Sequence, residues 1–232
     1  MNKRQFRLAR IWSNGQLRTI GALVEGTVVN VSAGEDIDKE GSNYVSYFPG
    51  AKEYWITNYA PGAYRGFQGR PQELLLDLRD ELPEKLERRF DVVFNHTTLE
   101  HVFDVRLAFA NLCRLSRDLV IVVVPFAQVQ HESEAYQDFW RFTPTCIRRL
   151  FSENGLEVVY EAVSPDVNAA VYLFFVGSRS PDRWRPVLPK NGELQEVGDW
   201  IGAANIRWPW LARTTLREWV ARIRRGLRGR NP

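Results

Sequence analysis

The sequence predicts an α/β fold: a doubly wound, mainly parallel seven-stranded sheet that ends in an antiparallel hairpin. Apolar, β-rich runs alternate with helical stretches over residues 1–178, an order typical of a parallel sheet with helices on both faces. The run "LVIVVV" is continuously apolar, as expected of a strand covered on both faces. The last two runs lie too close together for a helical crossover, so their strands are expected to be antiparallel.

The strands are expected, in chain order, at residues 27–33, 53–59, 73–78, 91–97, 118–125, 156–163 and 170–178. A buried crossover helix is predicted before the fifth strand, within residues 102–116, because apolar residues recur there at short steps. A second helix is predicted at residues 143–154. Its expected N-cap is Thr143, its first helical residue is Pro144, and Gly155 follows its end.

Length and composition predict one soluble domain with an appendage. The 232 residues are 44% hydrophobic, which is enough to bury one sizeable core. The two cysteines, Cys113 and Cys146, fall in predicted helices without zinc-type spacing, which argues against a disulfide framework and favours a reducing compartment. The basic N-terminus lacks a signal-peptide core, and no run reaches about 18 apolar residues. A cytoplasmic protein is therefore expected.

Charge divides the chain into parts. Residues 207–230 hold eight arginines and one acid, Glu218, a net charge of +7 that leaves the rest at −4 within a total of +3. We therefore expect an α/β domain at 1–178, a proline-rich linker or surface segment at 179–206, and a basic amphipathic C-terminal helix at 207–232.

The expected C-terminal helix allows several partners. A basic amphipathic helix with tryptophans fits an anionic membrane surface, which would place the protein peripherally at the inner face of the membrane. It fits an acidic protein partner as well, and it also fits packing back on its own sheet with the arginines in water. Nucleic acid is not expected, because the basic character is confined to this segment.

Two long segments carry a resemblance to a known family. They are "FDVVFNHTTLEHVFDVRLAFANLCRLSRDLVIVVVPF" and "HESEAYQDFWRFTPTCIRRLFSENGLEVV". Both resemble class I S-adenosylmethionine-dependent methyltransferases of the methyltransferase type 11-like kind, over about residues 20–178. The resemblance implies S-adenosylmethionine as cofactor, bound beyond the carboxyl ends of the strands. The implied cofactor-binding residues are Asn30, Ser32, Ala33, Gly34, Asn58, Tyr59, Asp77, Leu78, Asn95, His96 and Thr97.

The expected cofactor turn departs from the family pattern. The family usually has an acidic residue followed by three glycines at set positions, and this chain has Asn30, Ser32, Gly34 and Asp36 there. Only Gly34 matches, although aspartate adopts left-handed backbone more readily than most residues. Gly34 also fits an ordinary glycine between a strand and a loop.

The ribose and adenine positions also depart from the pattern. Asn58 stands where the family generally has an acid for the ribose hydroxyls, and it loses the charge assistance that strengthens such bonds. Tyr59 is expected to cover one adenine face. Asp77 matches the adenine-side acid, although the register could shift to Asp80 and Asp77 could instead be a helix N-cap. Asn95, with His96 and Thr97, is expected to line the methionine side.

His131 is the candidate general base. It lies in a polar loop beyond the fifth strand, and a neutral imidazole can take the proton of an acceptor hydroxyl. The alternative is an exposed loop histidine without a role. Arg141 is expected either to pair with Asp138 or to bind an anionic acceptor. The histidines and acids show no metal-ligand spacing, so no metal site is expected.

The sequence thus favours a methyltransferase that acts on a hydroxyl of a small-molecule or polymeric acceptor. Subgroup resemblance and the aromatic side chains of the loop favour a glycan, such as a sugar in surface polysaccharide biosynthesis; these side chains are Tyr136, Phe139 and Trp140. The degenerate turn favours the alternative, a methyltransferase-fold binding or scaffold module without catalysis. A third interpretation is a nucleic acid or protein methyltransferase guided by the basic tail.

Overall fold

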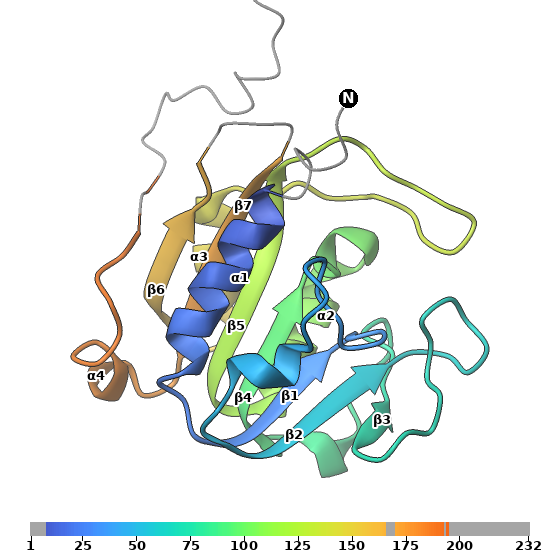
Figure 1. The fold of residues 1–232 in the computed structure, drawn as a ribbon, viewed down its shortest axis with the longest axis horizontal. Helices are drawn as coiled ribbons and strands as arrows, with labels where there is room; N and C mark the ends of the chain where they lie inside the picture. The colour runs from blue at the N-terminus through green and yellow to red at the C-terminus, as the bar shows by residue number, and fades with distance from the viewer. Residues whose placement is uncertain (1–7, 166–169, 193, 195–232) are drawn as a thin grey trace, which may run out of the picture.

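The computed structural model describes residues 8–165, 170–192 and 194, which contain one seven-stranded sheet (Figure 1). Its strand order is β3-β2-β1-β4-β5-β7-β6, and β7 runs antiparallel to both β5 and β6. The other pairings are parallel, so the predicted fold class is confirmed. The strands are β1 (Gly26–Val31), β2 (Ala51–Asn58), β3 (Glu73–Leu75), β4 (Phe90–His96), β5 (Ser116–Ala127), β6 (Glu157–Val163) and β7 (Val171–Ser178).

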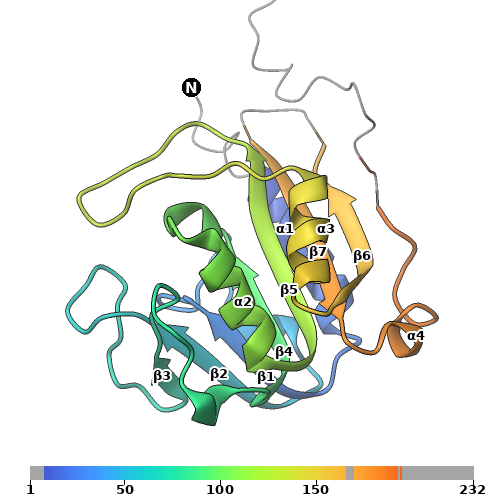
Figure 2. The same cartoon turned by 180° about the vertical axis from the view of Figure 1, so that it is seen from behind.

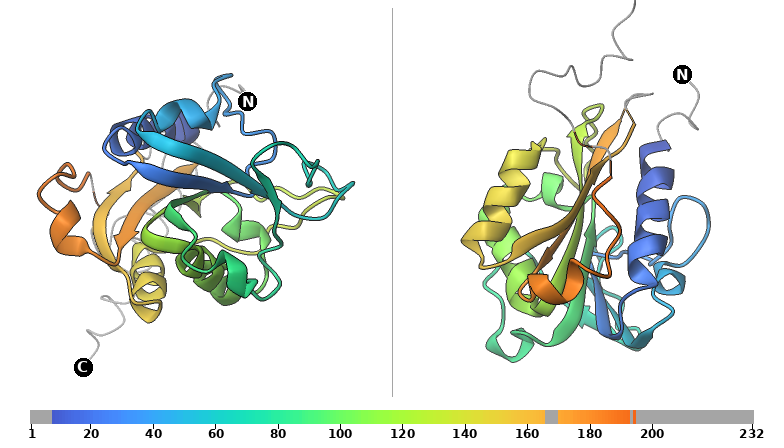
Figure 3. Two further views of the ribbon diagram at one scale, coloured as in Figure 1. Left: turned by 90° about the horizontal axis from the view of Figure 1, so that it is seen from below. Right: turned by 90° about the vertical axis from the view of Figure 1, so that its left-hand side faces the viewer.

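Helices cover both faces of the sheet and bury one apolar cluster on each. Helices α2 (Val105–Leu115) and α3 (Pro144–Glu153) pack on one face, as Figure 2 shows. Helix α1 (Leu8–Gly21) covers the opposite face near β7, and the edge-on view of Figure 3 separates the layers. Thr143 caps α3 as predicted, since its hydroxyl accepts a hydrogen bond from Cys146 N at 3.2 Å.

The sequence prediction differs from the structure at three elements. Helix α1 was not anticipated, although Leu17 and Ile20 form part of a regular buried stripe on it. No α-helix joins β1 to β2; the short 3-10 helix η2 (Tyr44–Tyr47) lies there instead. Strand β3 ends at Leu75 rather than at residue 78. The face of the sheet opposite α2 and α3 is therefore covered mainly by the N-terminal helix α1.

The segment after β7 begins by packing on the sheet. Helix α4 (Pro181–Trp184) contacts β6 and β7, and Trp184 is buried with its Nε1 donating to Asp118 at 2.7 Å. The predicted basic helix at 207–232 lies outside the described residues, as does most of the predicted linker. Within the part of the chain that is described, no helix combines the length and apolarity needed to cross a membrane.

Candidate functional site

The candidate site lies beyond the carboxyl ends of β1, β2, β4 and β5. Strand β1 adjoins β4, so the chain reverses its direction of winding between them, and this is where open α/β sheets bind ligands. The loops after β2 and β5 project on this same side of the sheet (Figures 1 and 2). Two groups of residues matter here: the Gly34 turn (residues 32–36) and the Glu100 cluster (Glu100, His101 and His131).

The Gly34 turn keeps a left-handed geometry despite its unusual residues. Ser32, Gly34 and Asp36 have φ angles of 60°, 62° and 59°. A non-glycine residue rarely adopts such angles without compensation, and the turn is tied to β2 through Ala33 N and Thr57 O at 3.1 Å. A serine, a glycine and an aspartate thus share left-handed backbone within the five residues of this turn.

Asn58 holds the turn in place with every polar atom of its side chain. Its Oδ1 accepts from Gly34 N at 2.7 Å, and its Nδ2 donates to Gly34 O at 3.0 Å and to Glu73 at 2.7 Å. The residue is only 1% exposed. The predicted ribose ligand is therefore fully engaged by protein partners in this conformation.

Glu73, on β3, was not anticipated as part of the site. Besides Asn58, its carboxylate accepts from Gln68 N at 3.1 Å and from Arg70 N at 2.9 Å. Burial opposes ionisation, but these hydrogen bonds outweigh it and lower the pKa of Glu73. Glu73 thus links the loop after β2 to the turn.

Asn30 and Asp36 are also engaged with each other. Asn30 Nδ2 donates to Asp36 at 2.8 Å, and the Tyr54 hydroxyl donates to the same carboxylate at 2.7 Å. Burial raises the pKa of Asp36 despite these two hydrogen bonds. Tyr54 is a further site residue that the sequence did not single out.

The loop after β2 covers the floor of the expected cofactor site. A Cβ placed on Gly34 would lie 3.2 Å from Arg65 Cδ and 3.3 Å from Arg65 Cβ, so the arginine lies directly over the glycine. Tyr59, the predicted adenine contact, lies with its ring 5.8 Å from the Arg79 guanidinium carbon. Asp77 pairs with Arg79, whose hydrogen bonds lower the pKa of Asp77, and Leu78 is buried in the core. No helix begins directly after Asp77, so Asp77 is not a helix N-cap.

The predicted methionine-side residues lie at the end of β4, where His96 and Thr97 contact α1 and Asn95 contacts β1. Asn95 Nδ2 donates to Val31 O at 2.9 Å, while its buried Oδ1 has no hydrogen-bond partner. His96 Nε2 lies 2.9 Å from the Ser13 hydroxyl, and burial, together with the nearby Arg10 charge, holds the pKa of His96 well below its usual value. Thr97 Oγ1 accepts from Arg10 at 2.6 Å.

Arg10 is the main site residue that sequence reasoning missed. It projects from α1 toward Thr97 and the Tyr44 hydroxyl, and it forms no ion pair with any described carboxylate. Burial opposes its charge, yet the neighbouring tyrosines raise its pKa. The helical spacing of Leu17 and Ile20 was the signal that could have predicted α1, and with it this cation.

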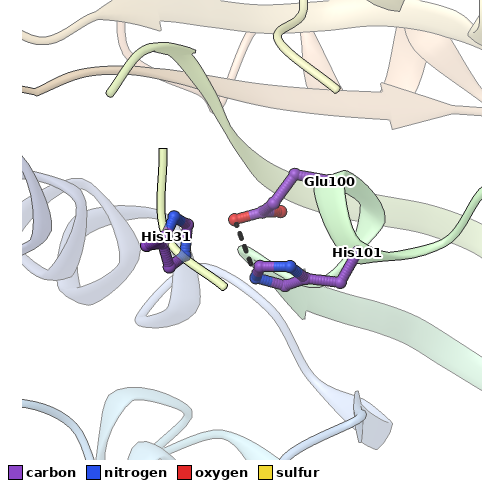
Figure 4. A group of neighbouring side chains, drawn as sticks. All are labelled: Glu100, His101 and His131. Carbon is purple, nitrogen blue, oxygen red and sulfur yellow. Dashed lines mark ion pairs between the residues drawn. The ribbon is translucent and has the colours of Figure 1, made fainter. Parts of the chain in front are cut away.

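The Glu100 cluster joins the turn after β4 to the loop after β5. Glu100 and His101 lie on the 3-10 helix η4 (Leu99–His101), and Glu100 O accepts a hydrogen bond from Phe139 N at 2.8 Å. Figure 4 shows the Glu100 carboxylate pointing between the rings of His101 and His131. One ligand atom from each of the three residues lies within 4.8 Å of the others.

The Glu100 carboxylate is buried without a hydrogen-bond partner among the described residues. Its side chain is 0% exposed, and neither oxygen meets a donor from residues 8–165, 170–192 or 194. Burial raises the pKa of Glu100 to about 8. Among the described residues, the nearest ionisable group is His101, whose Nε2 lies 3.8 Å from Glu100 Oε1, and burial lowers the pKa of His101.

His131, the predicted base, lies beside a carboxylate that is itself held by an arginine. Its Nδ1 is 3.2 Å from Asp138 Oδ2, and its side chain is 37% exposed. Arg141 donates to both oxygens of Asp138 at 2.6 Å. Burial disfavours the charged carboxylate of Asp138. The hydrogen bonds from Arg141 and from the backbone N–H of His131 outweigh this effect and lower the pKa of Asp138 to about 2. Of the two expectations for Arg141, the structure therefore shows pairing with Asp138.

Known structures share this architecture. No protein-family model matches the sequence, and no curated protein matches it. Magnesium protoporphyrin IX methyltransferase from Synechocystis, solved with S-adenosylhomocysteine, is similar at 13% identity and a TM-score of 0.50, over 78% of this chain and 89% of that one. The YcgJ protein of Bacillus subtilis is similar at 12% identity and a TM-score of 0.53, over 73% and 98%.

A third structure adds to this likeness. The Haloferax volcanii protein solved in complex with the Trm112 methyltransferase activator is similar at 15% identity and a TM-score of 0.51, over 75% of this chain and 92% of that one. The strand order, with its antiparallel β7, agrees with these matches. The chain has the fold of the class I S-adenosylmethionine-dependent methyltransferases.

Proposed function

We propose that this chain is an S-adenosylmethionine-dependent methyltransferase that acts on a hydroxyl group of a small-molecule or glycan acceptor. The observation that carries the proposal is the left-handed Gly34 turn, which follows β1 at the point where the sheet reverses its winding. A serine and an aspartate are held there at φ angles near 60°, at a cost that the packing of β2 offsets. Such strain is expected where a backbone must receive a ligand closely.

The described residues fit the amino-acid end of the cofactor. Asn95 Oδ1 is a buried acceptor without a partner among the described residues, which suits an ammonium group. Arg10 is a cation without an ion pair among the described residues, which suits a carboxylate. At the nucleoside end, Tyr59 and Asp77 are the proposed contacts, and Asn58 is proposed to act through the turn that it holds.

Binding the nucleoside requires Arg65 to leave Gly34. The obstruction is one side chain on an exposed loop, and the turn beneath it is held by Asn58 rather than by Arg65. Bound S-adenosylmethionine supplies a methyl group on a sulfonium, which an acceptor oxygen can displace. The chain's contribution is to position the acceptor and to receive its proton.

The acceptor is proposed to bind at the loop after β5. Phe103, Phe139 and Trp140 form an exposed aromatic cluster, with the rings of Phe103 and Phe139 centred 5.3 Å apart. Aromatic faces of this kind stack on sugar rings, which supports a sugar of a surface polysaccharide as the acceptor. His131 is proposed as the base, because the Asp138 carboxylate beside Nδ1 favours a proton there and leaves the lone pair on Nε2, from which the Gln128 amide, 3.2 Å away, would have to withdraw.

The proposed cellular setting follows from the basic C-terminal segment. A cytoplasmic protein whose residues 207–232 bind anionic lipid or an acidic partner would meet a membrane-linked acceptor at the inner face of the membrane. Removing these residues is expected to abolish co-sedimentation with vesicles that contain anionic lipid. Unchanged co-sedimentation would contradict this part of the proposal.

The second candidate function is a binding module without catalysis. The position of Arg65 over Gly34 and the full engagement of Asn58 favour it, because both close the nucleoside site in this conformation. Isothermal titration of the full chain with S-adenosylmethionine and S-adenosylhomocysteine separates the two candidates. Saturable binding supports the enzyme, whereas no binding near millimolar cofactor supports the module.

The role of His131 needs a separate test. The variant His131→Ala is expected to lower the release of S-adenosylhomocysteine by about 100-fold or more, with cofactor affinity unchanged. Glu132→Gln, which changes an exposed neighbour in the same loop, serves as the control. Equal turnover of His131→Ala and the control would remove the base role without affecting the proposed cofactor site.

A further inference from the structure

We propose that Glu100, His101 and His131 form a binding site for one divalent transition-metal ion of the zinc class. The three residues come from two segments about thirty positions apart, and η4 and the loop after β5 bring them together (Figure 4). Sequence spacing gave no sign of this site, because metal-binding motifs are recognised from short spacings within one segment. The inference does not depend on the proposed function.

The first argument is the state of Glu100. Its side chain is 0% exposed, and both carboxylate oxygens lack a hydrogen-bond partner from the described part of the chain. Buried carboxylates are normally paired, hydrogen-bonded or bound to a metal. Neither arginine near it, Arg10 or Arg141, forms an ion pair with it in the part of the chain that the structure describes. A cation held between the two imidazoles would give this unpartnered carboxylate the partner that it lacks.

The second argument is the support around the two histidines. His101 Nδ1 lies 2.6 Å from Gln137 O, so this nitrogen donates its proton to the carbonyl and Nε2 keeps a lone pair. His131 has the Asp138 carboxylate 3.2 Å from its Nδ1, and an ion bound at Nε2 would take the place of the Gln128 amide, which lies 3.2 Å from that atom. A carbonyl or carboxylate at the second ring nitrogen is the usual support of a metal-binding histidine, because it fixes the tautomer and raises basicity.

The donor set indicates the class of metal. Two imidazole nitrogens and one carboxylate suit zinc and ferrous iron, whereas magnesium and calcium prefer oxygen donors alone. Neither cysteine takes part, since Cys113 lies buried in α2 and Cys146 lies on α3. The three ligand atoms within 4.8 Å must approach one another to reach zinc bonds of about 2.0–2.2 Å.

The site leaves one coordination position toward solvent. Three protein ligands are the number typical of zinc sites that also bind water or a substrate, and the side chain of His131 is 37% exposed. An ion bound there would occupy the His131 nitrogen that is proposed above to accept the proton of the acceptor. It would then lower the pKa of a bound acceptor hydroxyl instead of leaving His131 to accept its proton.

The test is metal binding by the full-length, tag-free chain. Cys146→Ser removes the exposed thiol from the background, and a chelator strips the protein before titration with Zn²⁺ against a chromophoric indicator. We expect one Zn²⁺ per chain, with affinity lowered at least about 100-fold in His101→Ala, in His131→Ala and in Glu100→Gln. Asp138→Asn is expected to cost about 10- to 100-fold, as for loss of a supporting carboxylate.

Matched controls separate a built site from general affinity for acids and histidines. Glu132→Gln and Glu134→Gln change exposed acids of the same loop and are expected to bind Zn²⁺ like the background protein. His96 remains in all variants, so zinc held by that histidine would survive every change. Circular dichroism checks that each variant is folded.

Cobalt supplies a spectroscopic readout. Co²⁺ in a four- or five-coordinate site absorbs visible light far more strongly than the aqua ion, and this absorption is expected in the background protein and lost in His101→Ala. Equal Zn²⁺ affinity in the background protein and in a His101→Ala/His131→Ala double variant would overturn the proposal. Failure of the background protein to bind Zn²⁺ at millimolar concentration would overturn it as well. His101→Ala leaves the proposed base in place, so loss of metal and loss of the base can be told apart.

Discussion

Glu73 and Glu100 are both buried glutamates at the carboxyl edge of the sheet, and their surroundings are opposite. Glu73 accepts hydrogen bonds from Asn58, Gln68 N and Arg70 N, and its pKa is lowered. Glu100 accepts no hydrogen bond from any residue that the structure describes, and burial raises its pKa to about 8. A satisfied carboxylate stabilises the fold, whereas an unsatisfied one costs stability unless a ligand meets it.

The same contrast separates the two halves of the site. Around the Gly34 turn, polar side chains such as Asn58 and Asp36 are engaged with protein partners, which makes this half a rigid platform. Beyond β4, Asn95 Oδ1 and the Glu100 oxygens are unpartnered. On this comparison we expect the first half to form the platform on which the proposed nucleoside lies and the second half to supply unpartnered groups that contact ligands directly, and each expectation can be tested residue by residue.

The largest effect is expected from Asn58→Ala. It removes three hydrogen bonds at once and leaves the backbone of Gly34 and the carboxylate of Glu73 without these partners. The free energy of unfolding is expected to fall by about 3–4 kcal/mol. Urea denaturation measures it, with Asn43→Ala as the control, because Asn43 is exposed and its side chain caps nothing. Equal stabilities of the two variants would contradict the interpretation of the Gly34 turn and its partners as a rigid platform.

The two glutamates should respond with opposite signs to the same substitution. Glu73→Gln replaces a carboxylate that accepts several hydrogen bonds with an amide that has only one acceptor oxygen. We therefore expect the free energy of unfolding to fall by about 1–3 kcal/mol. Glu100→Gln removes an unpartnered buried acid, and metal-free protein is expected to gain about 1–2 kcal/mol. Urea denaturation in chelator measures both. A loss of stability in Glu100→Gln as large as in Glu73→Gln would contradict the proposed difference between the two glutamates.

The contribution of Glu73 should also depend on pH. Because its folded pKa lies below the unfolded value of about 4.3, its charge stabilises the fold above that value, and the effect disappears as pH falls through the folded pKa. The difference in unfolding free energy between the natural protein and Glu73→Gln is therefore expected to be constant from pH 7 to 5 and to shrink toward pH 3. A difference that persists unchanged at pH 3 would show that the charge of Glu73 is not what matters.

The smallest effect is expected from Arg65→Ala. Removing the side chain that covers Gly34 spares the cofactor the cost of displacing it, so the affinity for S-adenosylhomocysteine should rise by about two- to tenfold. Isothermal titration measures this, and Arg106→Ala on the exposed side of α2 is the control. Weaker binding in Arg65→Ala than in the control would show that Arg65 holds the cofactor rather than covers its site.

Much of the fold was predictable because its signals are local. Continuous apolar runs predicted the sheet, and Thr143, Pro144 and Gly155 predicted the limits of α3. Helix α1 was missed because its residues are polar on most sides and no acidic residue marks its first turn. Strand β3 ended early because its partner β2 ends at Asn58, which is paired with Leu75, so the residues after Leu76 have no strand to pair with.

The site was predictable in position but not in detail. Strand ends marked Gly34, Asn58 and Asn95, because parallel strands align their carboxyl ends. The partners of these residues could not be predicted, since Glu73 and Arg10 reach them across the fold rather than along the chain. The Glu100 cluster was invisible for the same reason, because only the return of the loop after β5 places His131 beside His101.

The most direct test of the account is a crystal structure of the full chain grown with S-adenosylhomocysteine and Zn²⁺. The account predicts the nucleoside above Gly34 with Arg65 displaced, the amino-acid end near Asn95 and Arg10, and one ion bound by Glu100, His101 and His131. A structure in which Arg65 still covers Gly34 and neither ligand is bound, at concentrations well above millimolar, would contradict it.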